Sequence, residues 1–208
     1  MKRFLKLWLC LVFAAAMQAT AQTGKPVMHS YAFDDNGILT GMSDNGLWAV
    51  ASATNSSNTL ILENPRLLGV DSGTELLLSE GYEEGVSLNC GANDVTNDGN
   101  VVVGRFGGLP AVWRRTGETS GAWTQLPVPD GYDGGVVNTV TPDGKYAVGV
   151  ATTSTNILLE KEVMWDLTTN AILATPGLPA KDAAHLDQGQ SRFTAISANG
   201  RYVRGCKS

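Results

Sequence analysis

The chain has 208 residues, with 15 Lys or Arg against 20 Asp or Glu, so its formal net charge at pH 7 is −5. This length fits one domain, and the negative charge disfavours nucleic acid or an anionic membrane surface as a partner. The composition is rich in Gly, Thr, Asn and Val and poor in long helical patterns, which is typical of short strands joined by tight turns.

The first 21 residues have the pattern of a secretory signal peptide. Three positive charges, on Lys2, Arg3 and Lys6, precede an apolar run from Leu7 to Met17. Ala19-Thr20-Ala21 then forms an A-x-A cleavage site, and the apolar run is too short to span a membrane. A buried N-terminal helix is the alternative interpretation. The order of these features favours export to the periplasm, cell surface or medium, with no transmembrane segment in the mature chain.

Cysteine usage gives little further information. Cys10 follows the large residues Trp8 and Leu9, whereas lipid attachment requires small residues at those positions, so we expect no lipid anchor. Cys90 and Cys206 remain after cleavage. An exported location permits a disulfide between them, but their spacing leaves the pairing open.

The rest of the chain contains four related segments. They share an apolar residue, Ser or Thr, any residue, Asp or Asn, Gly, any residue, and an apolar run that ends in a small residue: Met42–Ala51, Val95–Gly104, Val140–Gly149 and Ile196–Gly205. The intervals between their glycines are 53, 45 and 56 residues. Periods of this size belong to propeller blades or solenoid units, and the uneven spacing favours blades, whose loops tolerate insertions.

The centre of each segment predicts a tight hairpin turn. Asn-Gly and Asp-Gly pairs tolerate the positive φ angles of such turns, and they occur at Asn45-Gly46, Asp98-Gly99, Asp143-Gly144 and Asn199-Gly200. We interpret these eight residues as structural. The apolar run after each turn predicts a strand that is buried on both faces.

A second hairpin completes each unit. Ala111–Arg114 and Ala122–Pro127 flank a Gly-rich turn in the second unit, and Val163–Asp166 and Ala171–Leu173 flank Thr168-Thr169-Asn170 in the third. The first unit is more diverged, and we expect Leu60–Leu62 to replace its Trp-containing strand and Thr74–Leu78 to form the next one. Two hairpins make a four-stranded antiparallel sheet, the size of a propeller blade.

The predicted fold is therefore all-β, a β-propeller of four-stranded antiparallel blades that is incomplete, with about three and a half blades. The expected organisation is a signal peptide at 1–21, a lead-in at 22–40 and propeller repeats at 41–208. The repeats divide at about 41–90, 91–135, 136–190 and a partial 191–208. Arg204 stands where the other units have Val50, Val103 and Val148, so we expect the last unit to be solvated there.

Two stretches resemble known bacterial repeats. The segment Ala92–Gly104, followed by Ala111–Arg114, resembles the HAF-type extracellular repeat, and Thr141–Gly149 is similar to the Ser-Pro-Asp-Gly hairpin of TolB-like and WD40-like β-propellers. The resemblance covers roughly Ser43 to Gly205. It implies a propeller fold but says little about function, because propellers host many functions. The family has no catalytic residues to carry over.

Common catalytic and metal-binding patterns are missing from the sequence, so we expect no catalytic residue, metal site or cofactor. Asp143 and Gly144 are adjacent, which excludes the spacer of a sialidase Asp-box. The oxygens of Asp34, Asp35 and Asn36 are consecutive rather than alternate, which favours a solvated turn over a calcium loop. His29 and His185 are the only histidines, and we interpret them as surface or loop residues.

Three tryptophans could be read as a sugar-stacking platform. Trp113 and Trp165 recur at one repeat position, which indicates core packing between blades. Trp123 is out of phase and lies beside a Gly-rich turn, so it is the candidate ligand-binding residue.

The favoured function is an exported, non-catalytic binding or scaffold module for an unknown protein or glycan. Gly107–Pro110 and Ala151–Glu162 are the candidate contact regions. One alternative is a fragment of a carbohydrate-active propeller enzyme, which would need two carboxylates about 5–10 Å apart. Another is a truncated gene product without an independent function.

Export is tested by mass spectrometry of protein purified from cell envelopes. We expect Gln22 at the N-terminus, because the predicted cleavage follows Ala21. An Ala21→Arg variant, which removes the small residue of the cleavage site, should retain its leader. Recovery of wild-type protein with an intact Met1 in the cytosol would contradict export.

Overall fold

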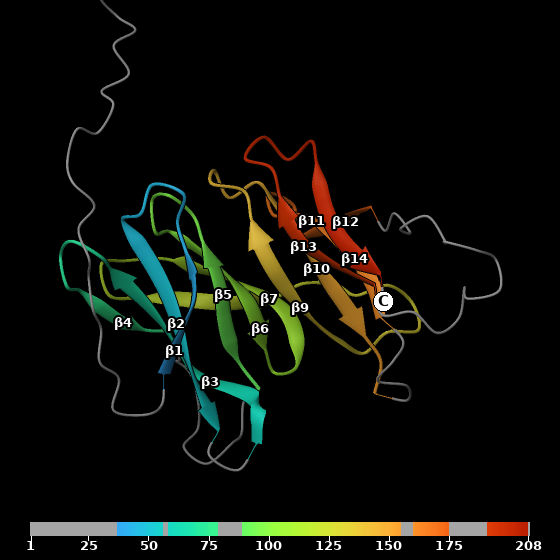
Figure 1. Ribbon diagram of the computed structural model, residues 1–208, viewed down its shortest axis with the longest axis horizontal. Coiled ribbons are helices and arrows are strands. Elements are labelled where there is room, and N and C mark those ends of the chain that lie inside the picture. Colours follow the sequence, from blue (N-terminus) through green and yellow to red (C-terminus); the bar gives the residue numbers. More distant parts are fainter. Residues whose placement is uncertain (1–36, 56–57, 79–88, 155–159, 175–190, 208) are drawn as a thin grey trace, which may run out of the picture. The chain divides into compact units, whose positions relative to one another are not determined.

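The described regular elements are all β-strands in antiparallel sheets (Figure 1). The computed structural model describes residues 37–55, 58–78, 89–154, 160–174 and 191–207, which lie in one compact unit, Ala32–Ser208. None of these residues forms a helix with the length and apolar character that a membrane span requires. The predicted all-β class is confirmed.

Three sheets have four strands each, and the strands of each sheet lie side by side in chain order. Blade 1 contains β1 (Gly37–Met42), β2 (Trp48–Asn55), β3 (Asn58–Gly69) and β4 (Glu75–Leu77). Blade 2 contains β5 (Gly91–Val95), β6 (Val101–Phe106), β7 (Leu109–Arg115) and β8 (Gly121–Gln125). Blade 3 contains β9 (Gly134–Val140), β10 (Tyr146–Thr152), β11 (Glu160–Asp166) and β12 (Ala171–Ala174). Blade 4 has two strands, β13 (Ser191–Ile196) and β14 (Val203–Lys207).

The sheets have the size and strand order of propeller blades. The first strand of each blade lies next to the first strand of the following blade, so β1, β5, β9 and β13 are successive neighbours. Blade 1 begins at Gly37, inside the segment 22–40 that the repeat pattern assigns to a lead-in. The described residues thus form three and a half blades of an incomplete propeller.

The register of blade 1 differs from the prediction. Trp113 pairs with the third residue after its turn glycine, and Trp165 does the same in blade 3. The equivalent residue of blade 1 is Leu68, opposite Ala49. Leu60–Leu62 do lie in the strand to which they were assigned, but they are not the register equivalents of the Trp position, because β3 is a 12-residue strand and without a Trp its sequence does not mark the register.

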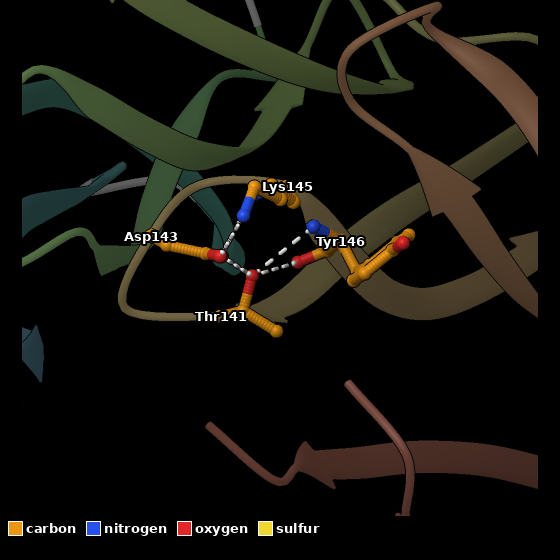
Figure 2. Close-up of polar contacts among 4 residues, drawn as sticks. All are labelled: Thr141, Asp143, Lys145 and Tyr146. Atoms are coloured by element: carbon orange, nitrogen blue, oxygen red, sulfur yellow. Dashed lines mark hydrogen bonds and ion pairs between the residues drawn. The ribbon is translucent and has the colours of Figure 1, made fainter. Parts of the chain in front are cut away.

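Figure 2 shows the turn between β9 and β10, where side chains replace part of the backbone ladder. The hydroxyl of Thr141 donates a hydrogen bond to Asp143 Oδ1 (2.7 Å) and accepts one from the backbone N–H of Tyr146 (3.1 Å). The same carboxylate oxygen accepts the backbone N–H of Lys145 (3.1 Å). Gly144 donates its N–H to the carbonyl of Thr141 (2.8 Å) and has φ +71°.

The same turn occurs in the other three blades. A Ser or Thr hydroxyl donates to the Asp or Asn side chain two residues later, from Ser43 to Asn45, Thr96 to Asp98 and Ser197 to Asn199. The φ angles of Gly46, Gly99 and Gly200 are also positive, at 71°, 68° and 69°. Among the described non-glycine residues, positive φ occurs only at Asn64, Asn89 and Asn170. The Asp or Asn of each turn therefore contributes a side-chain acceptor, and only the glycine contributes the left-handed conformation.

The hydrophobic cores lie between blades. Blades 1 and 2 share one core, which consists of Val50, Leu67, Leu78, Ala92, Val95, Val102 and Trp113. Blades 2 and 3 share another, which consists of Val103, Val112, Leu126, Val137, Val140, Ala147, Ala151, Val163, Trp165 and Leu167. Val102 and Val103 adjoin on β6 and belong to different cores, because successive strand residues face opposite sides. The prediction of strands buried on both faces is confirmed for β2, β6 and β10, but not for β14, in which Val203 and Arg204 are exposed.

The turn glycines also form contacts between blades. An added Cβ at Gly99 would overlap the ring of Trp48 from blade 1, and one at Gly200 would overlap the ring of Tyr146 from blade 3. At Gly46, by contrast, no described atom lies within 4 Å of an added Cβ. An aromatic residue of the preceding blade therefore occupies the space that a side chain would need at Gly99 and Gly200.

Alanine substitutions at two turn glycines separate backbone strain from blade packing. Gly46→Ala should lower the free energy of unfolding by about 1–2 kcal/mol, the cost of a left-handed residue with a Cβ. Gly99→Ala should cost about 1–3 kcal/mol more, because Trp48 must also move. Urea denaturation of both variants measures the difference. Equal losses would contradict the packing role of Gly99.

Candidate functional site

The antiparallel order gives the blades two distinct ends. The turn end carries the links between the first and second strands and between the third and fourth strands. The loop end carries the links between the second and third strands and between successive blades. Both predicted contact regions lie at the loop end, although residues 155–159 of Ala151–Glu162 fall outside the described residues.

At the loop end, four residues from blades 2 and 3 form a connected group that we name the Arg105 cluster. Arg105 donates from Nε to the carbonyl of Gly135 (3.0 Å) and from Nη1 to Oδ1 of Asn89 (3.1 Å). Gly108 donates its N–H to the carbonyl of Asn89 (3.3 Å), and Gly135 donates its N–H to the carbonyl of Gly108 (3.1 Å). The cluster fixes the guanidinium across the junction of the two blades.

The charge of Arg105 is not balanced by any described carboxylate at ion-pair distance. The ion pairs among the described residues join Arg66 to Glu75 (3.3 Å) and Lys145 to Asp143 (2.9 Å). Burial lowers the pKa of the Arg105 guanidinium, which nevertheless stays protonated because the ordinary value is so high. A partly buried cation with neutral acceptors attracts an acidic group.

A second set of polar groups lies on the loop-end part of blade 3. Asp133 accepts the backbone N–H of Ser154 (2.7 Å) and also the Ser154 hydroxyl, and these bonds lower the pKa of its carboxyl group. Lys161 Nζ lies 6.0 Å from the centre of the Tyr132 ring. Burial and the neighbouring charge of Glu162 raise the pKa of the Tyr132 phenol. These groups offer donors, acceptors and an aromatic face to a ligand.

The first strand of every blade contains a β-bulge. In each pairing with the second strand, one residue six positions before the turn glycine has no partner: Thr40, Asn93, Asn138 and Thr194. A bulge re-aims its side chain away from the regular pleat. Three of these side chains donate to the next blade, from Thr40 to the carbonyl of Ala92 (2.5 Å), Asn93 to that of Val137 (2.8 Å) and Asn138 to that of Phe193 (2.5 Å).

These donors are not predicted from the sequence. Their only local signal is a polar residue at a fixed distance before each Asp-Gly or Asn-Gly turn, and such residues are common in strands of mixed composition. The bulge that directs them depends on pairing with another strand. We assign them to blade-to-blade attachment, since each known acceptor is a backbone carbonyl of the neighbouring blade.

Asp94 forms a second polar link between blades 2 and 3. Its Oδ2 accepts the Thr139 hydroxyl (2.6 Å) and the backbone N–H of Val140 (2.9 Å). Burial raises the pKa of this carboxyl group, and the bonds from Thr139, Val140 and Val95 oppose the shift. Its Oδ2 is thus committed to the blade junction, while Oδ1 accepts the backbone N–H of Val95 in the same blade.

The tryptophans have different environments. Trp113 and Trp165 are buried in the cores between blades. Trp123, the candidate ligand-binding residue, is partly buried, stacks on Phe106 with ring centres 5.9 Å apart, and donates its indole N–H to the carbonyl of Leu78 (2.6 Å). Its polar group therefore joins blade 2 to blade 1, and its ring contacts Phe106.

Several residues considered in the sequence lie outside the described part of the chain. These are the signal peptide, His29, His185 and the Asp34–Asn36 group. Cys90 is buried, while nothing is described of the side chain of Cys206. Within the described ranges, no group of three or more His, Cys, Asp or Glu side chains could hold a metal ion.

No family model matches the sequence, and a comparison with curated proteins gives no match. Among solved structures, TolB from Acinetobacter baumannii is 19% identical, with a TM-score of 0.43 over 83% of this chain and 43% of that one. The Cps50 (Swd1) β-propeller domain from Myceliophteria thermophila is 14% identical, with a TM-score of 0.47 over 80% and 48%. Hydrazine synthase from Kuenenia stuttgartiensis is 12% identical, with a TM-score of 0.46 over 80% and 42%. The chain spans less than half the length of each.

The blades and their junctions define an incomplete β-propeller, with three four-stranded blades and one two-stranded blade among the described residues. The TolB-like and WD40-like propellers that the sequence resembles are also the class of two of these structural neighbours. The HAF-type repeat has no matching family model.

The pH dependence of stability tests the role of Asp94. Because burial raises its pKa in the folded state, the protonated form stabilises the fold below the ordinary value of 3.8, and this stabilisation is lost as pH rises through the folded pKa. In Asp94→Asn, stability should no longer fall over that range. Urea titration at several pH values measures the difference in the free energy of unfolding between wild type and variant. The change of this difference with pH gives the contribution of Asp94.

Asp143→Asn is the matched control for this measurement. Bonds from Lys145 and Thr141 lower the pKa of Asp143, so its stabilisation is present above 3.8 and is lost as pH falls through the folded value. The two variants should therefore change the pH dependence in opposite directions. A change of the same sign in both would contradict the raised pKa of Asp94.

Proposed function

We propose that this protein is an exported, non-catalytic propeller that binds a protein or glycan partner at its loop end. The Arg105 cluster is the observation that carries the proposal. It holds a cation in a fixed position with two neutral acceptors, and no described carboxylate pairs with it. An acidic group of the partner, such as a uronic acid or a protein carboxylate, would complete the pairing.

The neighbouring groups support the same assignment. Gly107 and Gly108 both have positive φ, at 61° and 81°, and they keep the β6–β7 link short, so a ligand can approach the guanidinium closely. Tyr132 and Lys161 lie on the adjacent blade at the same end. Binding sites on repeat folds commonly use loops that a rigid scaffold positions.

Three of the described carboxylates are bonded into the scaffold, which supports a non-catalytic role for them. Asp94 is bonded into the junction of blades 2 and 3, and Asp98 and Asp143 are bonded within their own turns. A glycosidase requires two carboxylates on either side of a bound sugar, about 5–10 Å apart. A carboxylate that accepts bonds from its own scaffold is poorly available for that task.

Site-specific photocrosslinking tests the loop end as the binding surface. Asp130, between β8 and β9, and Glu118, between β7 and β8, are exposed acidic residues at opposite ends of blade 2. With a benzophenone amino acid at either position in producing cells, we expect a discrete crosslinked product from position 130 and none from 118. Equal products from both positions would contradict the proposal.

Arg105→Gln tests the recognition of an acidic group. The amide keeps one donor for Gly135 or Asn89 but loses the charge. On an array of neutral and uronic-acid oligosaccharides, or by crosslink yield from position 130, binding should fall by about tenfold, the usual effect of losing one charged hydrogen bond. Unchanged binding would exclude Arg105. Turnover of any oligosaccharide that is abolished by replacing one carboxylate would exclude the non-catalytic role.

A further inference from the structure

The three blade junctions share one packing rule. The residue two positions after a turn glycine lies against the turn glycine of the next blade. Trp48 does so at Gly99 and Tyr146 at Gly200, while Val101 Cγ2 would lie 3.4 Å from a Cβ at Gly144. Each blade therefore presents a side chain to the following blade and a glycine surface to the preceding one.

Two polar contacts accompany this packing. The bulge residue donates to the carbonyl seven positions before the next turn glycine, as described for Ala92, Val137 and Phe193. At the junction of blades 1 and 2, Asn45 also donates its backbone N–H to Asn97 Oδ1 (3.0 Å) and its Nδ2 to the Asn97 carbonyl (2.8 Å). Each contact thus has a donor half on one blade and an acceptor half on the next.

Blade 1 has the glycine surface and the acceptor groups of such a junction, but no described residue contacts them. No described atom approaches Gly46 within 4 Å of an added Cβ. Leu39 and Met42 are 55% and 60% exposed, whereas the equivalent residues of the next two blades are buried: Ala92, Val95, Val137 and Val140. Asp44 is exposed at the position that Asn97 has in blade 2. We name Leu39, Met42, Asp44 and Gly46 the blade 1 face.

Blade 4 carries the donor halves. Tyr202, two residues after Gly200, is 70% exposed, although its equivalents Trp48, Val101 and Tyr146 are partly buried in junctions. The Thr194 hydroxyl lies 3.5 Å from the carbonyl of Arg204, much as the Thr40 hydroxyl lies 3.2 Å from that of Val50. Asn199 is exposed at the position of Asn45. We name Thr194, Asn199, Tyr202 and Arg204 the blade 4 face.

We propose that the blade 4 face of one copy of this chain docks on the blade 1 face of a second copy. Tyr202 then lies on Gly46, the Thr194 hydroxyl donates to the carbonyl of Leu39, and Asn199 donates to the Asp44 carboxylate. Every one of these contacts repeats a junction inside the chain. A heterologous contact of this kind forms a closed ring or an open chain of copies, depending on the rotation per copy.

Arg204 fits this arrangement despite its charge. It occupies the position of the buried Val50, whose neighbours in the next blade include Ala92 and Val95, so it would lie against Leu39 and Met42. Its aliphatic part can cover those side chains while the guanidinium stays in water or near Asp44. The exposed Arg201 and Arg204 also give the blade 4 face a charge opposite to that of Asp44.

Sedimentation velocity of the purified protein over a range of concentrations tests the proposal. We expect wild type to form species of at least twice the monomer mass. Tyr202→Ser and Met42→Glu each damage one face at an exposed position, so both variants should stay folded, and each should raise the dissociation constant by about tenfold or more. Leu173→Glu, at a 52% exposed residue on β12 outside both faces, is the control and should associate like wild type.

Mixing the two damaged variants distinguishes this contact from other modes of association. The Met42→Glu variant keeps an intact blade 4 face and the Tyr202→Ser variant an intact blade 1 face, so their equimolar mixture should associate more strongly than either variant does alone. Wild type that stays monomeric at every soluble concentration would overturn the proposal. So would association of Tyr202→Ser alone at wild-type strength, which would indicate a symmetric contact between two blade 1 faces.

Discussion

The structure depends on covering both faces of each small sheet. A four-stranded antiparallel sheet whose central strand is apolar on both sides cannot exist alone in water, because each face must pack on another sheet. Val102 faces blade 1 and Val103 faces blade 3, so the stability of blade 2 resides in its two neighbours. A row of adjoining blades, rather than a single blade, is therefore the unit that folds.

The polar contacts of the blades follow from this requirement. Close packing of two sheets leaves little room for side chains near the turns, so the glycine that the turn requires at position 99 also makes room for Trp48. The bulge in the first strand of blades 1, 2 and 3 turns a Thr or Asn towards a carbonyl of the next blade, so a polar group at the junction is satisfied rather than buried alone. Packing and hydrogen bonding together fix the order in which blades adjoin.

The turn end and the loop end of the blades differ in how their polar groups are bonded. At the turn end, hydroxyl, carboxylate and amide groups are bonded within or between the turns, as at Thr141, Asp143 and Asn45. At the loop end, Arg105 keeps its charge without a described carboxylate, and Tyr132 and Lys161 lie nearby on blade 3. The proposed binding role uses these groups of the loop end, although Arg114 at the turn end also has neutral acceptors, the Leu167 carbonyl and Asn170 Oδ1.

The sequence by itself determined the repeat, the four-stranded units, the turn glycines and the strands buried on both faces. These features are local, since turn chemistry and strand periodicity act over a few residues. Only the tertiary structure decided the position of Leu68 in β3, the bulge donors such as Asn93, the capture of the Trp123 indole by Leu78 and the assembly of the Arg105 cluster. Each of these pairs residues that are far apart in the chain, and a pairing between strands or blades leaves no signal in the local sequence.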